Sequence, residues 1–229
     1  MDGSRPPGTF SIVACDSDRK FWGVAVATKP PSVGATVPWA EWRVGAIATQ
    51  AYSNFWYGPR GLELLRKGLS AHDVVQKLTR SDPGRDKRQL GVVDRRGRSF
   101  AWTGSKCIET GMHQTGDGYA CQGNRLASER VVPAMVSAIE ARRGPLGRRM
   151  MSALQAGARA GGDKLGMESA AMLVVHRERW FSPAWSNYWV NLRVDLHPRP
   201  IQELNRLLRK DEAETRRFLA HRVALRKRW

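Results

Sequence analysis

The sequence predicts an α+β protein in which two mostly antiparallel β-sheets are stacked between layers of helices. The first observation is the order of the predicted elements, in which groups of strands alternate with groups of helices. The second is that the predicted strands are apolar along nearly their whole length, which is typical of strands covered on both faces. The third is the chain length of 229 residues, which fits one large layered domain.

The N-terminal part of the chain is predicted to form the first sheet. Residues 10–14 and 23–28 are apolar runs rich in valine and alanine, and the polar segment between them is typical of a β-hairpin. After a pair of prolines, residues 33–39 and 44–50 are two further extended segments. Together these segments predict an early antiparallel sheet.

Two helices and a second hairpin are predicted next. Leu62, Leu65 and Leu69 recur at helical spacing, and Ser70 is a suitable N-cap for a helix over residues 71–79. A hairpin is predicted around Gly97, and the glycine-rich segment that follows it is predicted to be irregular. The hairpin strands are residues 89–94 and 98–103, the irregular segment is 104–118, and a short strand follows at 119–122.

The second half of the chain repeats this grouping. The predicted helices are residues 129–142, 146–160 and 200–210, and the predicted strands are 170–176 and 188–195, joined by an aromatic loop at 180–185. We therefore expect a leader (residues 1–8), one domain (residues 9–210) and an arginine-rich tail (residues 211–229) with little apolar surface to bury.

The composition argues against several classes of protein. No apolar run approaches the ~18–20 residues that span a bilayer, and the N-terminus lacks the apolar stretch of a signal peptide, so a cytoplasmic protein without a membrane partner is predicted. The three cysteines and five histidines lack the spacing of metal ligands, so no zinc site, disulfide framework or cofactor is expected. The net charge of +17 is explained either by a solvated basic surface or by nonspecific binding of nucleic acid.

Thr9 follows Gly8 at the start of the first predicted strand and has two interpretations. It is either an ordinary β-branched strand residue or a nucleophile that uses its own α-amino group as the base. An α-amine has a pKa of about 7.7–8.0, which suits a general base near neutral pH. Because an amide nitrogen has no basicity, the second interpretation requires removal of residues 1–8.

Several blocks of the sequence resemble one family when they are taken together. They are TFSIVA at 9–14, VGATVPWA at 33–40, VGAIATQA at 44–51, YGPRGL at 57–62, DPGR at 82–85, RQLGVVD at 88–94, QGN at 122–124, AGGD at 160–163 and SAA at 169–171. The chain resembles the domain of unknown function 1028 family over residues 9–208, and that family is similar in fold to the N-terminal nucleophile (Ntn) hydrolases. The resemblance implies a four-layer αββα sandwich with Thr9 as the nucleophile. Members of the family commonly begin with Met followed directly by this Thr, whereas this chain has an eight-residue leader.

Polar residues near the ends of the predicted elements are candidates for binding a substrate. They are Gln50, Asn54, Arg60, His113, Gln122, Asn124 and Asp163. The amides of Gln50, Gln122 and Asn124 are suited to hold a substrate amide or an oxyanion. For Asn54, capping of a loop is the alternative. Arg60 stands at a helix start, where a cation is unfavourable unless it pairs with a carboxylate of the protein or of an anionic substrate.

The last two candidates have equally plain structural alternatives. His113 lies in the glycine-rich segment, where a loop at the mouth of a site is expected, but a lone histidine is commonly structural. Asp163 either orients a basic group or belongs to the turn that ends the preceding helix.

The leading hypothesis is a Thr9-dependent hydrolase that cleaves an amide or ureido bond of a small anionic metabolite after loss of residues 1–8. The alternative is a non-catalytic sandwich protein that binds nucleic acid or another polyanion through its basic surface. A homodimer is expected.

Overall fold

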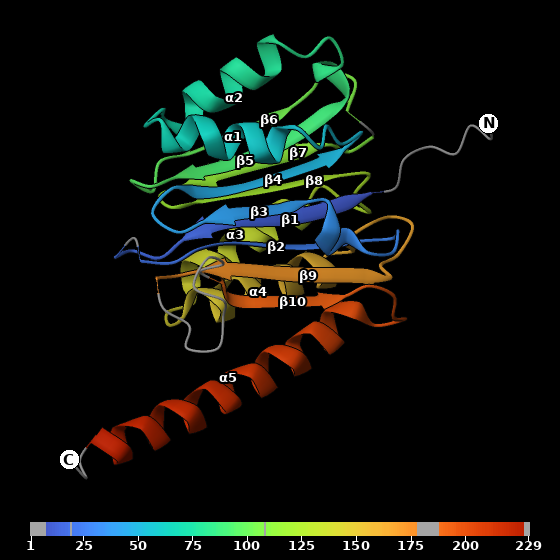
Figure 1. The fold of residues 1–229 in the computed structure, drawn as a ribbon. Helices are drawn as coiled ribbons and strands as arrows, with labels where there is room; N and C mark the ends of the chain where they lie inside the picture. The colour runs from blue at the N-terminus through green and yellow to red at the C-terminus, as the bar shows by residue number, and fades with distance from the viewer. Residues whose placement is uncertain (1–7, 19, 108, 178–187, 227–229) are drawn as a thin grey trace.

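The computed structural model describes residues 8–18, 20–107, 109–177 and 188–226, which form two antiparallel sheets and five α-helices (Figure 1). The strands are β1 (Thr9–Cys15), β2 (Trp22–Thr28), β3 (Pro38–Glu41), β4 (Gly45–Ala51), β5 (Arg88–Asp94), β6 (Ser99–Thr103), β7 (Met112–Gly116), β8 (Tyr119–Asn124), β9 (Ser169–Val175) and β10 (Tyr188–Val194). The helices are α1 (Tyr57–Arg66), α2 (Ala71–Arg80), α3 (Val131–Ala141), α4 (Leu146–Arg159) and α5 (Pro200–Arg226). The larger sheet has the strand order β10-β9-β2-β1-β8-β7, and the smaller sheet has the order β3-β4-β5-β6.

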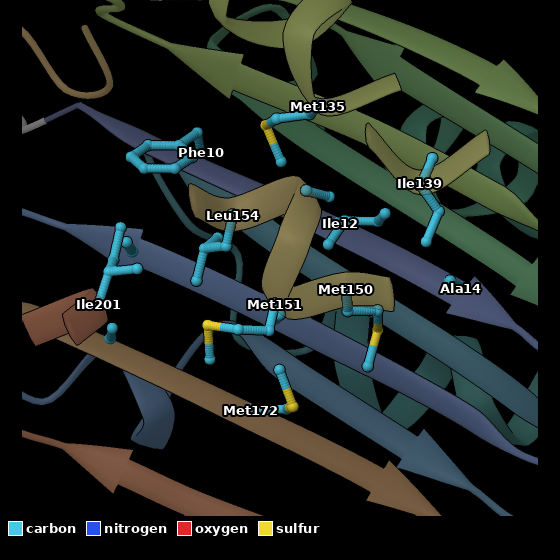
Figure 2. Close-up of a cluster of buried hydrophobic side chains, with 14 of the residues drawn as sticks. Phe10, Ile12, Ala14, Met135, Ile139, Met150, Met151, Leu154, Met172 and Ile201 are labelled. Atoms are coloured by element: carbon cyan, nitrogen blue, oxygen red, sulfur yellow. The ribbon is translucent and has the colours of Figure 1, made fainter. Parts of the chain in front are cut away.

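Helices cover the outer faces of both sheets. On the smaller sheet, Val74 and Leu78 of α2 belong to one buried cluster with Leu90 of β5. On the larger sheet, side chains of α3 and α4 such as Met135 and Leu154 belong to another buried cluster with residues of β1 (Figure 2). Helix α5 begins against β9 and β10, and its second half extends away from the sheets in Figure 1.

The side chains between the two sheets change from apolar to polar along the strands. Because side chains alternate along a strand, every second residue of the paired central strands faces the opposite sheet. At one end these residues are apolar and include Val13, Val24 and Val93. At the other end they are polar and buried, and we call this group the polar end. The polar end consists of Thr9, Ser11, Thr28, Gln50, Gln89, Gln122 and Asn124.

The predicted α+β class with two antiparallel sheets is confirmed. The prediction that the first four extended segments form one sheet is wrong, because β1 and β2 belong to the larger sheet and β3 and β4 to the smaller. Residues 33–39 also differ from their prediction as an extended segment: residues 33–35 form a short 3-10 helix, and β3 begins only at Pro38. Ser32 has a φ of 61°, and the Thr36 hydroxyl donates a hydrogen bond to the Val33 carbonyl. The backbone therefore turns at a place where apolar residues predict a strand.

Residues 104–118, predicted to be irregular, contain the edge strand β7. Most of its residues are exposed, so no alternation of apolar side chains marks it in the sequence. Its pairing with β8 follows a turn in which Gly118 adopts a φ of 76°. Glycine adopts such a positive φ without steric cost, which explains why a glycine-rich segment forms this hairpin.

The ends of the chain are described in part. Helix α5 is continuous from the predicted last helix into the predicted tail. Only Gly8 of the predicted leader is described, and the predicted aromatic loop 180–185 lies outside the described residues. The division into leader, domain and tail therefore stays a prediction. Among the described helices, none has the length and apolarity that crossing a bilayer requires.

Gly91 of β5 gives a direct test of how closely the two sheets pack. A Cβ atom at Gly91 would lie 2.3 Å from Gln122 Oε1, whereas a Cβ at Gly147 of α4 would meet its nearest neighbour at 3.5 Å. We expect Gly91→Ala to lower the free energy of unfolding by about 1–3 kcal/mol, the usual cost of overpacking. We expect Gly147→Ala to be neutral or to raise it by up to about 1 kcal/mol, because alanine favours helix. Urea unfolding measures both values, and equal stabilities for the two variants would contradict this packing.

Candidate functional site

The strand register brings the residues of the polar end together in the space between the sheets. The register pairs Thr9 with Thr28 and Asn124, Ser11 with Gln122, and Gln50 with Gln89. All of them are buried, and Thr9, at 6% exposure, is the most exposed. Because burying an amide without hydrogen bonds costs several kcal/mol, roughly 2–7, these side chains need to bond to one another.

Gln89 fixes the direction of the hydrogen bonds in the polar end. Its Nε2 atom lies 2.8 Å from the carbonyl oxygen of Gly123 and 3.2 Å from that of Met112. A carbonyl oxygen only accepts hydrogen bonds, so the amide nitrogen must point toward these two atoms. Gln89 Oε1 therefore faces the other way, where it accepts from Gln50 Nε2 at 2.7 Å and from Asn124 Nδ2 at 3.0 Å.

The same direction is imposed on the next side chains. Gln50 Nε2 also donates to the Thr9 carbonyl at 3.3 Å, and Gln50 Oε1 accepts from Ser11 Oγ at 2.6 Å. Ser11 Oγ in turn accepts from Gln122 Nε2 at 2.7 Å. Gln122 Oε1 and Asn124 Oδ1 then have no hydrogen-bond partner among the described residues. Each of these two amides also has a second N–H group besides the one that bonds to Ser11 or Gln89. The oxyanion role expected of Gln122 and Asn124 therefore stays a prediction.

Thr9 is connected to the peptide bond that precedes it. Its Oγ1 atom lies 3.0 Å from Thr28 Oγ1, and Thr28 Oγ1 donates to the Gly8 carbonyl at 2.6 Å. A hydroxyl has one proton, so Thr28 acts as the acceptor toward Thr9 and Thr9 is the donor. The Thr28 hydroxyl therefore links the predicted nucleophile to the carbonyl of the predicted cleavage site.

Asp163 lies directly beside Gly8. A Cβ atom on Gly8 would lie 2.5 Å from Asp163 Oδ1, so only glycine fits at this position without a shift of its neighbours. The two carboxyl oxygens accept hydrogen bonds from the backbone N–H groups of Lys29 (3.0 Å) and Leu165 (2.9 Å). Burial raises the pKa of Asp163 above its ordinary value, against the lowering effect of these hydrogen bonds. Asp163 thus supports the turn after α4 and contacts the residue before Thr9.

His113 is joined to the polar end through Thr103. Thr103 Oγ1 accepts from Gln89 Nε2 at 2.9 Å and lies 2.8 Å from His113 Nδ1. A hydroxyl oxygen can accept two hydrogen bonds, so the donor of the contact between Thr103 and His113 depends on the tautomer of the ring. Packing around the ring lowers the pKa of His113 by desolvation, although the residue as a whole is exposed, and this favours the neutral ring.

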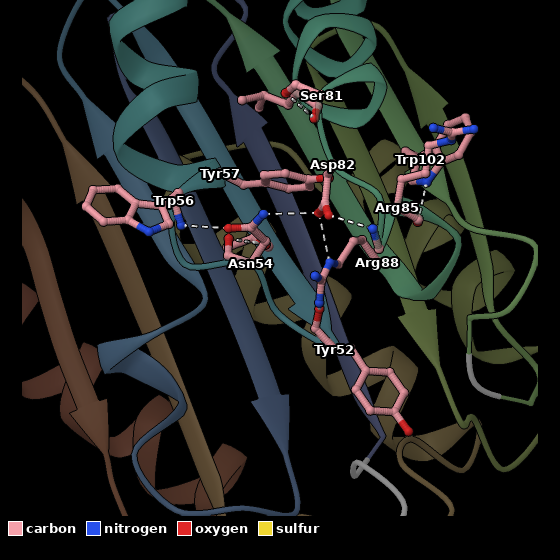
Figure 3. Close-up of polar contacts among 12 residues, drawn as sticks. Tyr52, Asn54, Trp56, Tyr57, Ser81, Asp82, Arg85, Arg88 and Trp102 are labelled. Atoms are coloured by element: carbon pink, nitrogen blue, oxygen red, sulfur yellow. Dashed lines mark hydrogen bonds and ion pairs between the residues drawn. The ribbon is translucent and has the colours of Figure 1, made fainter.

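Asn54 contacts a different group of residues, which is centred on Asp82 (Figure 3). Arg60 lines the same pocket as Asp82. Asn54 donates to Asp82 Oδ2 at 3.0 Å, and its own Oδ1 accepts from the Trp56 N–H at 3.1 Å. This is the capping role that was the alternative interpretation of Asn54. The Arg60 guanidinium lies over the Trp56 ring, 5.4 Å from its centroid, and has no ion pair with a carboxylate among the described residues.

Asp82 is saturated with donors. Besides Asn54, its Oδ2 accepts from the Tyr57 hydroxyl at 2.9 Å and from Arg88 Nε at 3.0 Å, and its Oδ1 accepts from the Gly84 N–H at 2.7 Å. Burial acts to raise the pKa of Asp82, but these donors, Arg88 above all, hold it well below its usual range. Asp82 is therefore a structural anion that fixes Arg88 and the start of α1.

Ser11, Thr28 and Gln89 are part of the polar end but were not among the predicted site residues. Thr9 and Ser11 are two residues apart, as are Gln122 and Asn124. Polar residues at this spacing in a strand face the same side of the sheet, so the sequence indicates that each pair lies on one face. No comparable signal marks Thr28 or Gln89, since each is a polar residue at the end of an apolar strand. Their role follows from the register between strands, which the sequence does not specify.

The comparisons with known proteins identify a family without an assigned activity. A family model described as "Family of unknown function (DUF1028)" matches residues 9–204. The crystal structure of a DUF1028 protein from Silicibacter pomeroyi is similar, with a TM-score of 0.80 and 36% sequence identity over 89% of this chain and 85% of the other. No curated protein matches the chain.

Replacing Gln89 tests its place at the centre of the polar end. Gln89→Leu removes the donor to the Met112 and Gly123 carbonyls and the acceptor for the amides of Gln50 and Asn124. We therefore expect a loss of about 3 kcal/mol or more in the free energy of unfolding. Gln114→Leu is a matched control on the exposed strand β7, where we expect a change within about 0.5 kcal/mol. Urea unfolding compares the two, and a Gln89 variant as stable as the control would contradict the network.

The low pKa of Asp82 predicts a pH dependence of stability. A carboxylate whose pKa is depressed in the folded state stabilises the fold above its unfolded pKa of about 3.9, and it loses this contribution as the pH falls toward the folded value. We expect the unfolding free energy of the wild type to fall more steeply between about pH 5 and pH 2 than that of Asp82→Asn. Parallel curves in urea unfolding across this range would show that Asp82 is not held in the charged form.

Proposed function

Because this chain belongs to the DUF1028 family, we propose that it is a Thr-dependent hydrolase of the Ntn type with the αββα arrangement of that class. The observation that carries the proposal is the position of Thr9, which is both the first residue of β1 and the first residue of the family match. Its hydroxyl faces the polar end, where buried amides converge. Polar groups gathered in a core are costly, and a functional site is a common reason for keeping them.

The proposed reaction is transfer of an acyl group to Thr9 followed by hydrolysis. The Thr9 hydroxyl attacks the carbonyl carbon of an amide or ureido bond while its proton passes to the α-amine of the same residue. The tetrahedral intermediate returns this proton to the leaving nitrogen, and an ester on Thr9 remains. Water, deprotonated by the same amine, then hydrolyses the ester and regenerates the threonine.

Removal of residues 1–8 is a requirement of this mechanism, and one hydrogen bond and one unpaired side-chain oxygen support it. The Thr28 hydroxyl polarises the Gly8 carbonyl, the carbonyl of the bond that must be cut. Asn124 is the register partner of Thr9, and its Oδ1 atom accepts no hydrogen bond from the described part of the chain. We infer that the α-ammonium group created at Thr9 by cleavage would supply a donor for this oxygen.

The substrate in this proposal is a small molecule with an N–H group beside the cleaved carbonyl. The unpartnered oxygens of Gln122 and Asn124 are acceptors of the kind that an amide or ureido N–H group needs. The anionic character expected from Arg60 stays a prediction, because Arg60 lies among the contacts of Asp82 and Trp56 and not in the polar end. The homodimer, the cytoplasmic location and the binding of polyanions also stay predictions.

The N-terminus of the purified protein tests the proposed maturation. We expect intact-mass spectrometry to find a chain that begins at Thr9, because only that form has the α-amine. Thr28→Val removes the hydroxyl that bonds the Gly8 carbonyl, and we expect it to slow cleavage about tenfold or more, as loss of one oxyanion donor does. Thr115→Val on the exposed strand β7 is the matched control. A protein that hydrolyses amides while it still begins at Met1 would contradict the proposed mechanism.

A further inference from the structure

A cavity outside the polar end has several cationic residues in its lining. It has a volume of about 380 Å³, and its lining residues are Tyr52, Pro83, Gly84, Asp86, Lys87, Arg88 and Lys106. This volume is in the range of small-molecule sites. Three of these side chains are cationic, and Asp86 is the single acid among them.

The segments around this cavity are held together by backbone hydrogen bonds. The Tyr52 N–H donates to the Lys87 carbonyl at 3.3 Å, and the Lys106 N–H donates to the Asp86 carbonyl at 2.7 Å. The Gly104 N–H donates to the Arg88 carbonyl at 3.0 Å. The cationic side chains therefore project from a fixed backbone, so their common placement does not depend on a mobile loop.

Arg88 is oriented toward this cavity by Asp82. Its Nε atom is bound to Asp82 Oδ2, and its Nη1 atom donates to the Tyr52 carbonyl. The Nη2 atom has no acceptor among the described residues and lies so close to Gly84 that a Cβ there would be 2.6 Å from it. Gly84 itself lines the cavity, so glycine at this position leaves room for an N–H donor at the cavity wall.

The two lysines add positive charge to the cavity, and Asp86 offsets this charge in part. Lys87 lies over the Tyr52 ring, with its Nζ atom 5.5 Å from the ring centroid. Within the described part of the chain, neither Lys87 nor Lys106 forms an ion pair with a carboxylate. Both are exposed, so they are free to turn toward a ligand.

We propose that this cavity binds a small oxyanion with two negative charges, held by Arg88 Nη2 and by the ammonium groups of Lys87 and Lys106, with Tyr52 as a flat wall. A phosphate group and a dicarboxylate share this chemistry, since both present several acceptor oxygens to charged donors. The site is separate from the proposed nucleophile. Arg88 is the residue before Gln89 in β5, so its side chain projects from the opposite face of the sheet.

Isothermal titration calorimetry of the full chain with inorganic phosphate and, separately, with succinate tests this proposal at constant ionic strength set by sodium chloride. We expect at least one of the two to bind, and the tighter one identifies the natural class of oxyanion. Lys87→Gln and Lys106→Gln should each weaken binding about fivefold, as expected for loss of one partly exposed charge. Lys67→Gln is the matched control, because Lys67 is an exposed lysine of similar setting that pairs with Glu63 and does not line the cavity.

The proposal is overturned if neither anion binds, or if both cavity variants bind as tightly as the wild type and the Lys67 control. The second result would assign binding to the general positive charge of the protein. Both lysines are exposed and make no buried contact, so loss of binding in a variant with an unchanged melting temperature cannot be attributed to unfolding. Because the measurement is of binding, its outcome does not depend on whether Thr9 is a nucleophile.

Discussion

The hydrogen bonds of Gln89 to two carbonyls of the opposite sheet are the constraint on which the polar end depends. Gln89 belongs to β5 of the smaller sheet, and its acceptors belong to Met112 of β7 and Gly123 of β8 in the larger sheet. These bonds join the two sheets at the end of the sandwich where apolar packing gives way to polar side chains. They also fix which way every amide in the group points, because backbone carbonyls cannot act as donors.

The fixed direction of the hydrogen bonds in the polar end determines which groups near Thr9 stay unpaired. The side-chain oxygen of Asn124, the register partner of Thr9, is left without a donor among the described residues. On the other side, Thr28 connects the Thr9 hydroxyl to the Gly8 carbonyl. The network is therefore incomplete at the place where removal of the leader would create a new donor, which is the physical basis of the proposed function.

The sequence was sufficient to predict the fold class because long apolar runs and changes of period are local properties. The approximate bounds of most strands and helices followed from the same patterns, whereas residues 33–39 and β7 depended on backbone turns and strand pairing. The site was predicted only in part. The predicted residues Gln50, Gln122 and Asn124 lie together near Thr9. Thr28 and Gln89 also belong to this group, but the pairing register of the strands places them there.

Asn54 and Arg60 show a second limit of sequence reasoning. They follow Gln50 in the chain, yet Asn54 bonds to Asp82 and Arg60 lines the same pocket as Asp82, on the side of the smaller sheet that the helices cover. Successive residues of a strand face opposite sides of the sheet. A shift of one residue therefore decides which side of the sheet the residues of the following loop contact. Nearness in sequence was therefore a poor guide to nearness in the site.

The most direct test of the central claim is to treat the protein with an electrophilic β-lactone, which acylates an activated hydroxyl, and to locate the adduct by peptide mass spectrometry. The account predicts one ester on the Thr9 hydroxyl, formed only in chains that begin at Thr9 and absent from Thr9→Ala. An adduct on another residue, or none in a folded protein that begins at Thr9, would contradict it.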